Sequence, residues 1–225
     1  MIETRPAPVA QTRTKPLLRG WSHQFAALAM LVVGPLVVLS APSLKSEICV
    51  AVACFSVTAM LTTSALFHRV NWSPPARRRM RRADHSAIFL CIAGSYTAVA
   101  GIALPVDDAW IVLSCVWVGA AGGVALRLLW MDAPKWAVAL PYLVVGWVAV
   151  GAVPELLHHL GGAGFGLLVG GGMLYTLGAV VYALRRPDPW PAVFGYHEIF
   201  HACVVAAAAT HLVLIAFVVL PLARP

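Results

Sequence analysis

Three histidines and one aspartate have the residue types and spacing to form a metal site. His197 and His201 stand four residues apart in the run YHEIFH at 196–201, and His68 and Asp84 lie far upstream. Residues four apart are separated by only about 40° around a helix, so both imidazoles can reach one ion. His68 would add a third nitrogen and leave a fourth position open, which is the ligand arrangement of catalytic zinc.

Two oxygen-bearing side chains are candidates for catalytic roles beside that metal. Asp84 could hydrogen-bond a water molecule and act as the general base, and Ser64, one helical turn before His68, could orient a ligand or the water. Each residue also has a simpler interpretation. Asp84 could be the N-cap of a helix, Ser64 could bond within or between helices, and His68 could be a packed core histidine. Taken together, the residues favour the metal site.

The stretch HEIFH also matches the zinc-protease pattern H-E-x-x-H, in which Glu198 would be the base. The next downstream histidine, His211, lies about 15 Å further along a helix than His201 and cannot share its ion. A membrane metalloprotease is therefore the weakest of the three functions that we consider. We expect Glu198 to stay at the headgroup boundary or to pair with an arginine, and His211 to form a hydrogen bond on the cavity-facing side. The remaining histidines, expected at the interface, in loops or on another face, are assigned no ligand role: His23, His85, His158 and His159.

The composition of the chain indicates the elements that must position these residues. The 225-residue chain is 60% hydrophobic and 11% charged, with a mean hydropathy of +0.83, which is typical of an integral membrane protein. Apolar runs of about 20 residues can cross a hydrocarbon core of roughly 30 Å. Alternating polar and apolar residues are not found, so we expect an all-α fold. We predict seven membrane helices, at 21–40, 48–67, 85–104, 109–130, 136–153, 165–184 and 193–220.

The distribution of basic residues predicts the orientation of this seven-helix bundle. Of the 16 lysines and arginines, only Lys45 and Arg224 fall in segments on one side of the membrane. Because cytoplasmic loops retain positive charge, we expect a cytoplasmic N-terminus and an extracytoplasmic C-terminus. The candidate site residues then share one depth near the cytoplasmic face: Ser64, His68, Asp84, His197 and His201.

The same pattern predicts how the chain is organised. We expect a basic cytoplasmic tail at 1–20, a seven-helix membrane domain at 21–221 and a short tail at 222–225. The arginines at 77–82 are expected to set the topology and contact anionic lipid, so no nucleic-acid partner is predicted. The five cysteines show no C-x-x-C spacing and are expected to be packing residues. The sequence indicates no oligomeric state.

Three stretches resemble the motifs of the hemolysin III family, which is related to the adiponectin and progestin receptors and the alkaline ceramidases. They are SALFH at 64–68, DHSAIFLCIAGSYT at 84–97 and HEIFHACVVAAAATH at 197–211. The resemblance covers nearly the whole chain in helix count and order, and it implies a zinc ion near the cytoplasmic face of a seven-helix bundle. In the family pattern the zinc ligands correspond to His68, His197 and His201, the water-holding carboxylate to Asp84, and the serine of S-x-x-x-H to Ser64.

These observations predict a zinc-dependent, ceramidase-like hydrolase of a lipid amide or ester in the cell membrane. A lipid substrate is expected because a cavity between membrane helices is open to acyl chains while the metal lies at headgroup depth. The alternative is a receptor-like or pore-forming protein, in keeping with the haemolytic activity for which the family is named. Zinc would then brace the cytoplasmic ends of the helices.

Overall fold

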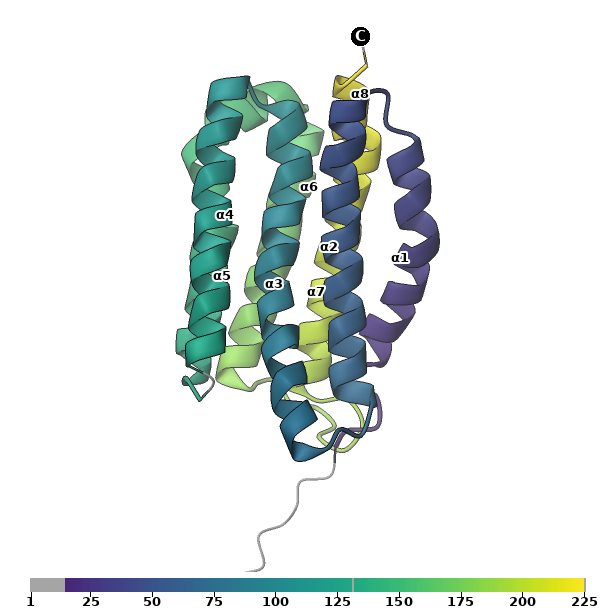
Figure 1. Cartoon of the computed structure of the whole chain (residues 1–225), viewed down its shortest axis with the longest axis vertical. Helices are drawn as coiled ribbons and strands as arrows, with labels where there is room; N and C mark the ends of the chain where they lie inside the picture. The colour runs from purple at the N-terminus through teal and green to yellow at the C-terminus, as the bar shows by residue number, and fades with distance from the viewer. Residues whose placement is uncertain (1–14, 131, 225) are drawn as a thin grey trace, which may run out of the picture.

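The protein is a bundle of helices in the computed structural model, which describes residues 15–130 and 132–224 (Figure 1). Within these ranges there is no strand, and six helical segments are long and apolar enough to cross a membrane. The all-α class predicted from the sequence is therefore confirmed. Residues 1–14, which include Arg5 and Arg13 of the predicted basic tail, and Pro225 lie outside the described ranges.

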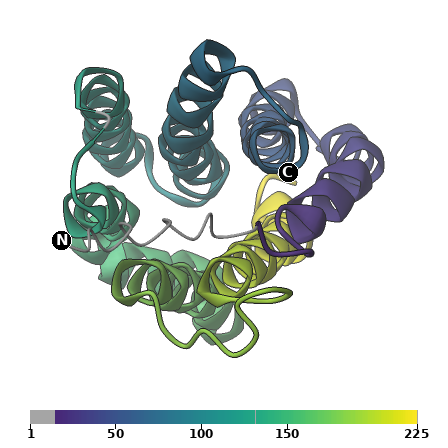
Figure 2. The same ribbon diagram turned by 90° about the horizontal axis from the view of Figure 1, so that it is seen from below.

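The long helices form a closed ring when the bundle is seen from one end (Figure 2). Successive long helices pack against one another from α1 to α7, and α1 also packs against α7, which closes the ring. The first and last helices are thereby brought together although they are far apart in sequence. In chain order the described elements are α1 (Trp21–Leu39), α2 (Leu44–Arg69), α3 (Pro74–Ala103), α4 (Val106–Leu129), α5 (Lys135–Gly146), η1 (Val148–Ala152), α6 (Val153–Leu184), α7 (Tyr196–Leu214), η2 (Ile215–Val219) and α8 (Leu220–Leu222).

Local sequence signals explain where α2 and α3 begin. Ser43 caps α2 through a reciprocal pair of bonds with Ser46, in which each side-chain oxygen accepts the other residue's backbone N–H. Helix α3 begins at Pro74, since proline suits the first helical turn, where its missing N–H is not needed. This start is earlier than the predicted helix at 85–104, because the arginines at 77–82 continue the helix beyond its apolar part.

This longer α3 corrects one interpretation of Asp84. The carboxylate lies well inside the helix rather than at its start, so the N-cap alternative for Asp84 is wrong. The residue is also buried. A buried carboxylate inside a membrane helix needs a polar partner, so we expect polar groups of neighbouring helices beside Asp84.

The fifth apolar segment, Ala139–Leu184, is 46 residues long, well beyond the roughly 20 residues that one crossing needs. It is not one straight helix. The short 3₁₀ segment η1 interrupts it, and Gly161 has φ 65 and ψ 174, a left-handed conformation that glycine adopts readily. The Trp147 indole N–H donates to the Thr176 hydroxyl at 3.0 Å, so the chain doubles back between these residues.

The break between α5 and η1 leaves backbone groups that need partners inside an apolar bundle. The Tyr96 hydroxyl donates to the Gly146 carbonyl at 2.7 Å and accepts the Ala149 N–H at 2.9 Å. An irregular backbone at membrane depth is tolerated where protein groups satisfy it in this way. One tyrosine of α3 therefore stabilises the turn of the neighbouring helices.

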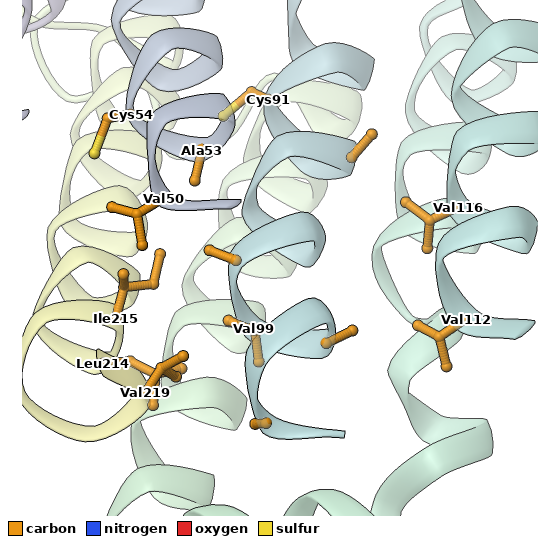
Figure 3. Close-up of a cluster of buried hydrophobic side chains, with 14 of the residues drawn as sticks. Val50, Ala53, Cys54, Cys91, Val99, Val112, Val116, Leu214, Ile215 and Val219 are labelled. Atoms are coloured by element: carbon orange, nitrogen blue, oxygen red, sulfur yellow. The ribbon is translucent and has the colours of Figure 1, made fainter. Parts of the chain in front are cut away.

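Buried apolar side chains form a core in the half of the bundle opposite the Arg-rich start of α3. Figure 3 shows Val50 of α2 and Val99 of α3 beside Leu214 of α7 and Ile215 and Val219 of η2. Val50, Leu214 and Val219 are fully buried. Because lipid tails are as apolar as these side chains, the packing is stabilised mainly by van der Waals contact. Contact of α3 with η2, together with the packing of α7 against α6 and α1, sets the position of the polar first turns of α7.

Candidate metal centre

The three predicted ligand histidines converge at one end of the bundle. His68 lies in the last turn of α2, while His197 and His201 lie in the first turns of α7. One ring nitrogen from each lies within 4.8 Å of the others. The His201 ring centroid is 4.9 Å from that of His68 and 4.6 Å from that of His197. The structure thus brings together side chains that the sequence placed at one depth.

One pair of these nitrogens is spaced as in a tetrahedral zinc site, and all three lie within 4.8 Å of one another. The Nε2 atoms of His68 and His197 are 3.3 Å apart. Two nitrogens bound to zinc at about 2.0–2.1 Å in tetrahedral geometry lie roughly 3.3–3.4 Å from each other. The buried Nδ1 of His201 has no hydrogen-bond partner among the described residues, so protein groups alone do not satisfy the cluster. Three imidazoles are also a donor set that suits zinc.

Asp84 and Ser64 lie beside the imidazoles, as the sequence predicted. The Oδ2 atom of Asp84 is 3.9 Å from Nε2 of His68. Ser64 and Asp84 line the same cavity beside the cluster, and both side chains are buried. Helices α2, α3 and α7 therefore bring a carboxylate and a hydroxyl to the edge of a three-nitrogen cluster.

Glu198 is engaged elsewhere. Its Oε1 atom forms an ion pair with Arg19, and its Oε2 atom accepts the Gly195 N–H at 2.8 Å, which caps the start of α7. The prediction that Glu198 pairs with an arginine is confirmed. The segment before α1 is also tied to the loop before α7, since the Leu17 N–H donates to the Ala192 carbonyl at 3.0 Å.

Two residues at the start of α1 contact the cluster: His23, which the sequence placed at the interface or in a loop without a role, and Gly20, which the sequence did not single out. The His23 ring stacks on His201 with centroids 3.9 Å apart and planes 9° apart, and His23 is only 2% exposed. Gly20 has φ 82, and a Cβ atom there would lie 2.8 Å from the Cβ of His68. The sequence could have indicated His23 by its depth in the membrane, because a helix that enters from the cytoplasmic side places its first turn at the level of the cluster.

A cavity of about 190 Å³ extends from the cluster between the helices. Asp84 and His201 line it near the start of α7, and Leu104 and Leu156 line it toward the opposite end of the bundle. Most of its walls are apolar, with a few polar groups, as in pockets for small ligands. It holds on the order of a dozen water-sized groups at roughly 10–15 Å³ each.

Fold and site together define a membrane-embedded helical protein with a buried three-imidazole cluster. The family model for haemolysin-III related proteins matches residues 11–212, and the chain belongs to this family of multi-pass membrane proteins.

Similarity to individual members of related families agrees with this assignment. The chain is 31% identical over 200 residues to Hemolysin-3 of Bacillus cereus, which covers 87% of this chain and 88% of that protein. It is 35% identical over 126 residues to the Hemolysin-3 homolog of Bacillus subtilis (strain 168), which covers 56% of each. The adiponectin receptor protein of Drosophila melanogaster is 48% identical over 54 residues, or 22% of this chain and 12% of that protein. No solved structure matches the chain. The predicted family and its relation to the adiponectin receptors are confirmed.

Proposed function

We propose that this protein is a zinc-dependent hydrolase of a lipid amide or ester. The observation that carries the proposal is a three-imidazole cluster with an adjacent buried carboxylate at the end of a long apolar cavity. This combination offers a metal site, a proton acceptor and room for an acyl chain in one place. The similarity to an adiponectin receptor protein identifies a related group of proteins but does not indicate a substrate for this one.

We further propose seven membrane crossings, with the N-terminus cytoplasmic and the C-terminus extracytoplasmic. Five of the six apolar segments suit one crossing each, and the 46-residue segment, which doubles back on itself, suits two. The arginines at 77–82 lie at the same end of the bundle as the metal site, and positive charge marks the cytoplasmic side. The crossings would occupy 21–221, between a basic tail and a short C-terminal tail.

In this mechanism the ion would be held by His68, His197 and His201. Zinc bound there supplies Lewis acidity, which polarises a lipid carbonyl and activates water. Asp84 accepts at Oδ2 a proton of the water whose oxygen bonds to the carbonyl carbon. It returns this proton to the amine or alcohol as the C–N or C–O bond breaks, and so acts as a general base and then a general acid. The Ser64 hydroxyl orients the Asp84 carboxyl group for both steps.

The remaining contacts position this machinery. His23 stacks against His201 and fixes the plane of its ring. The apolar walls of the cavity exclude bulk water and hold the acyl chain, so that the carbonyl group reaches the cluster. A lipid is the substrate class that enters such a cavity from the bilayer.

Two other functions make different predictions. The protease mechanism needs a free Glu198 carboxylate, whereas here both of its oxygens have partners. A receptor-like or pore-forming protein with structural zinc is the second candidate, because the cluster joins α2 to α7 and would brace two helices that are far apart in sequence.

The test is fatty-acid release from a panel of N-acyl and O-acyl lipids by the purified, zinc-loaded protein. Asp84→Asn should retain zinc and lose turnover by on the order of 10²–10⁴-fold. Glu198→Gln is the control and should retain turnover. An inactive Glu198→Gln beside an active Asp84→Asn would favour the protease. No cleavage of any lipid, together with a large loss of thermal stability when zinc is removed, would favour the structural role.

A further inference from the structure

The cavity contains a second polar site, deeper in the bundle than the metal cluster. His211 of α7 and Tyr175 of α6 both line the cavity, with ring centroids 5.7 Å apart. Cys91 of α3 also lines it. The mechanism above uses none of these groups. A polar layer inside an otherwise apolar membrane cavity is a candidate for ligand recognition.

The hydrogen bond of His211 determines which of its nitrogens can contact a ligand. Nε2 of His211 lies 3.1 Å from the Leu168 carbonyl oxygen. A carbonyl only accepts, so Nε2 must carry the proton and donate it. An apolar setting disfavours a charged ring, and a neutral ring with its proton on Nε2 presents the lone pair of Nδ1 as an acceptor. The site therefore suits a ligand group that donates a hydrogen bond.

The surroundings of His211 leave room for its ring in this position. A Cβ atom on Gly171 would lie 2.3 Å from the His211 ring, so the ring can occupy this place only because residue 171 lacks a side chain. Other hydroxyl groups along the cavity bond to backbone carbonyls. Ser95 donates to the Cys91 carbonyl and Thr176 to the Gly172 carbonyl. The protons of these hydroxyls are therefore used, whereas the neutral His211 ring offers a nitrogen lone pair as an acceptor at this depth.

The distance between His211 and the metal cluster determines the position along a bound ligand at which a hydrogen-bond donor would reach His211. His211 follows His201 by ten residues of continuous helix, which is about 15 Å along the axis. An extended chain advances roughly 3.3–3.6 Å for every three bonds, so about a dozen bonds cover this distance.

We propose that His211 forms a subsite for a hydroxyl group on the acyl chain of the bound lipid, about a dozen carbons from the carbonyl group that the cluster receives. The subsite distinguishes hydroxylated chains from plain ones of equal length. The inference rests on the proposed function for the identity of the ligand as an acyl lipid. It concerns binding, so it can be measured without turnover.

The test compares the binding of stearic acid, 12-hydroxystearic acid and 2-hydroxystearic acid to purified zinc-loaded protein in detergent, by displacement of a radiolabelled fatty acid. A net hydrogen bond should make the 12-hydroxy acid bind about 3- to 10-fold more tightly than stearic acid. The 2-hydroxy acid should show no such gain. In His211→Phe the gain should vanish while stearic acid still binds.

A matched pair of glycine variants tests the same geometry without removing the imidazole. Gly171→Ala should displace the ring and abolish the 12-hydroxy preference, whereas Gly170→Ala, whose Cβ would meet nothing within 4 Å, should preserve it. If the wild type binds the three acids equally, or His211→Phe keeps the preference, the subsite is overturned and the proposed hydrolase stands. If no fatty acid binds at all, the acyl cavity fails and the subsite fails with it.

Discussion

The contact between Gly20 and His68 gives a sensitive test of the metal site. In Gly20→Ala the new Cβ would lie 2.8 Å from the Cβ of His68, whereas ordinary contact begins at 3.4 Å. One of the two residues must therefore move by about 0.6 Å, which is more than the roughly 0.2 Å that metal-ligand distances tolerate. The left-handed backbone at φ 82 adds about 1–2 kcal/mol of strain for alanine.

We expect Gly20→Ala to weaken zinc binding by about 10–100-fold, the range seen when groups that support a metal ligand are altered. The assay is competition for zinc against a fluorescent chelator, with purified protein in detergent. The control is Gly34→Ala within α1, the helix that follows Gly20, where the new Cβ would meet the Cβ of Cys54 at an ordinary 3.5 Å. A folded Gly20→Ala protein with wild-type zinc affinity would refute the assignment of His68 as a ligand.

Two further predictions concern stability, and both are measured by thermal unfolding in detergent. Arg19→Gln leaves the buried Glu198 carboxylate with the Gly195 N–H as its remaining partner and should lower the free energy of unfolding by about 3 kcal/mol. The double variant Arg19→Gln, Glu198→Gln should recover most of this loss. Equal losses in the single and double variants would contradict a buried ion pair. Gly123→Ala would place a Cβ 2.2 Å from the fully buried ring of Phe89 and should lower the free energy of unfolding by about 1–3 kcal/mol. In the control Gly122→Ala the new Cβ meets nothing within 4 Å, so stability should be kept. Similar stabilities of the two variants would mean that α3 and α4 do not pack closely at Gly123.

The sequence predicts the main features of the site because they depend on local rules. Hydropathy identifies the membrane segments, and the four-residue spacing of His197 and His201 places them on one helix face. The distribution of basic residues then puts His68 and Asp84 at the same depth. The structure brings these side chains together as expected.

Hydropathy does not encode how the ring of helices closes or where a helix extends or breaks. The stacking of His23 on His201 requires α1 to pack against α7, the last long helix of the chain. The start of α3 was placed too late because its arginines at 77–82 form helix without being apolar. The break after Gly146 was missed because apolarity continues through it while the backbone changes to a 3₁₀ turn.

The central claim is that three imidazoles from α2 and α7 hold one zinc ion. Zinc K-edge X-ray absorption, with metal analysis, on purified wild type and His201→Ala tests it most directly. The wild type should contain one zinc with three nitrogen ligands at about 2.0–2.1 Å, and His201→Ala should lose the metal. Unchanged zinc content and an unchanged spectrum in His201→Ala, or sulfur ligands at about 2.3 Å, would contradict it.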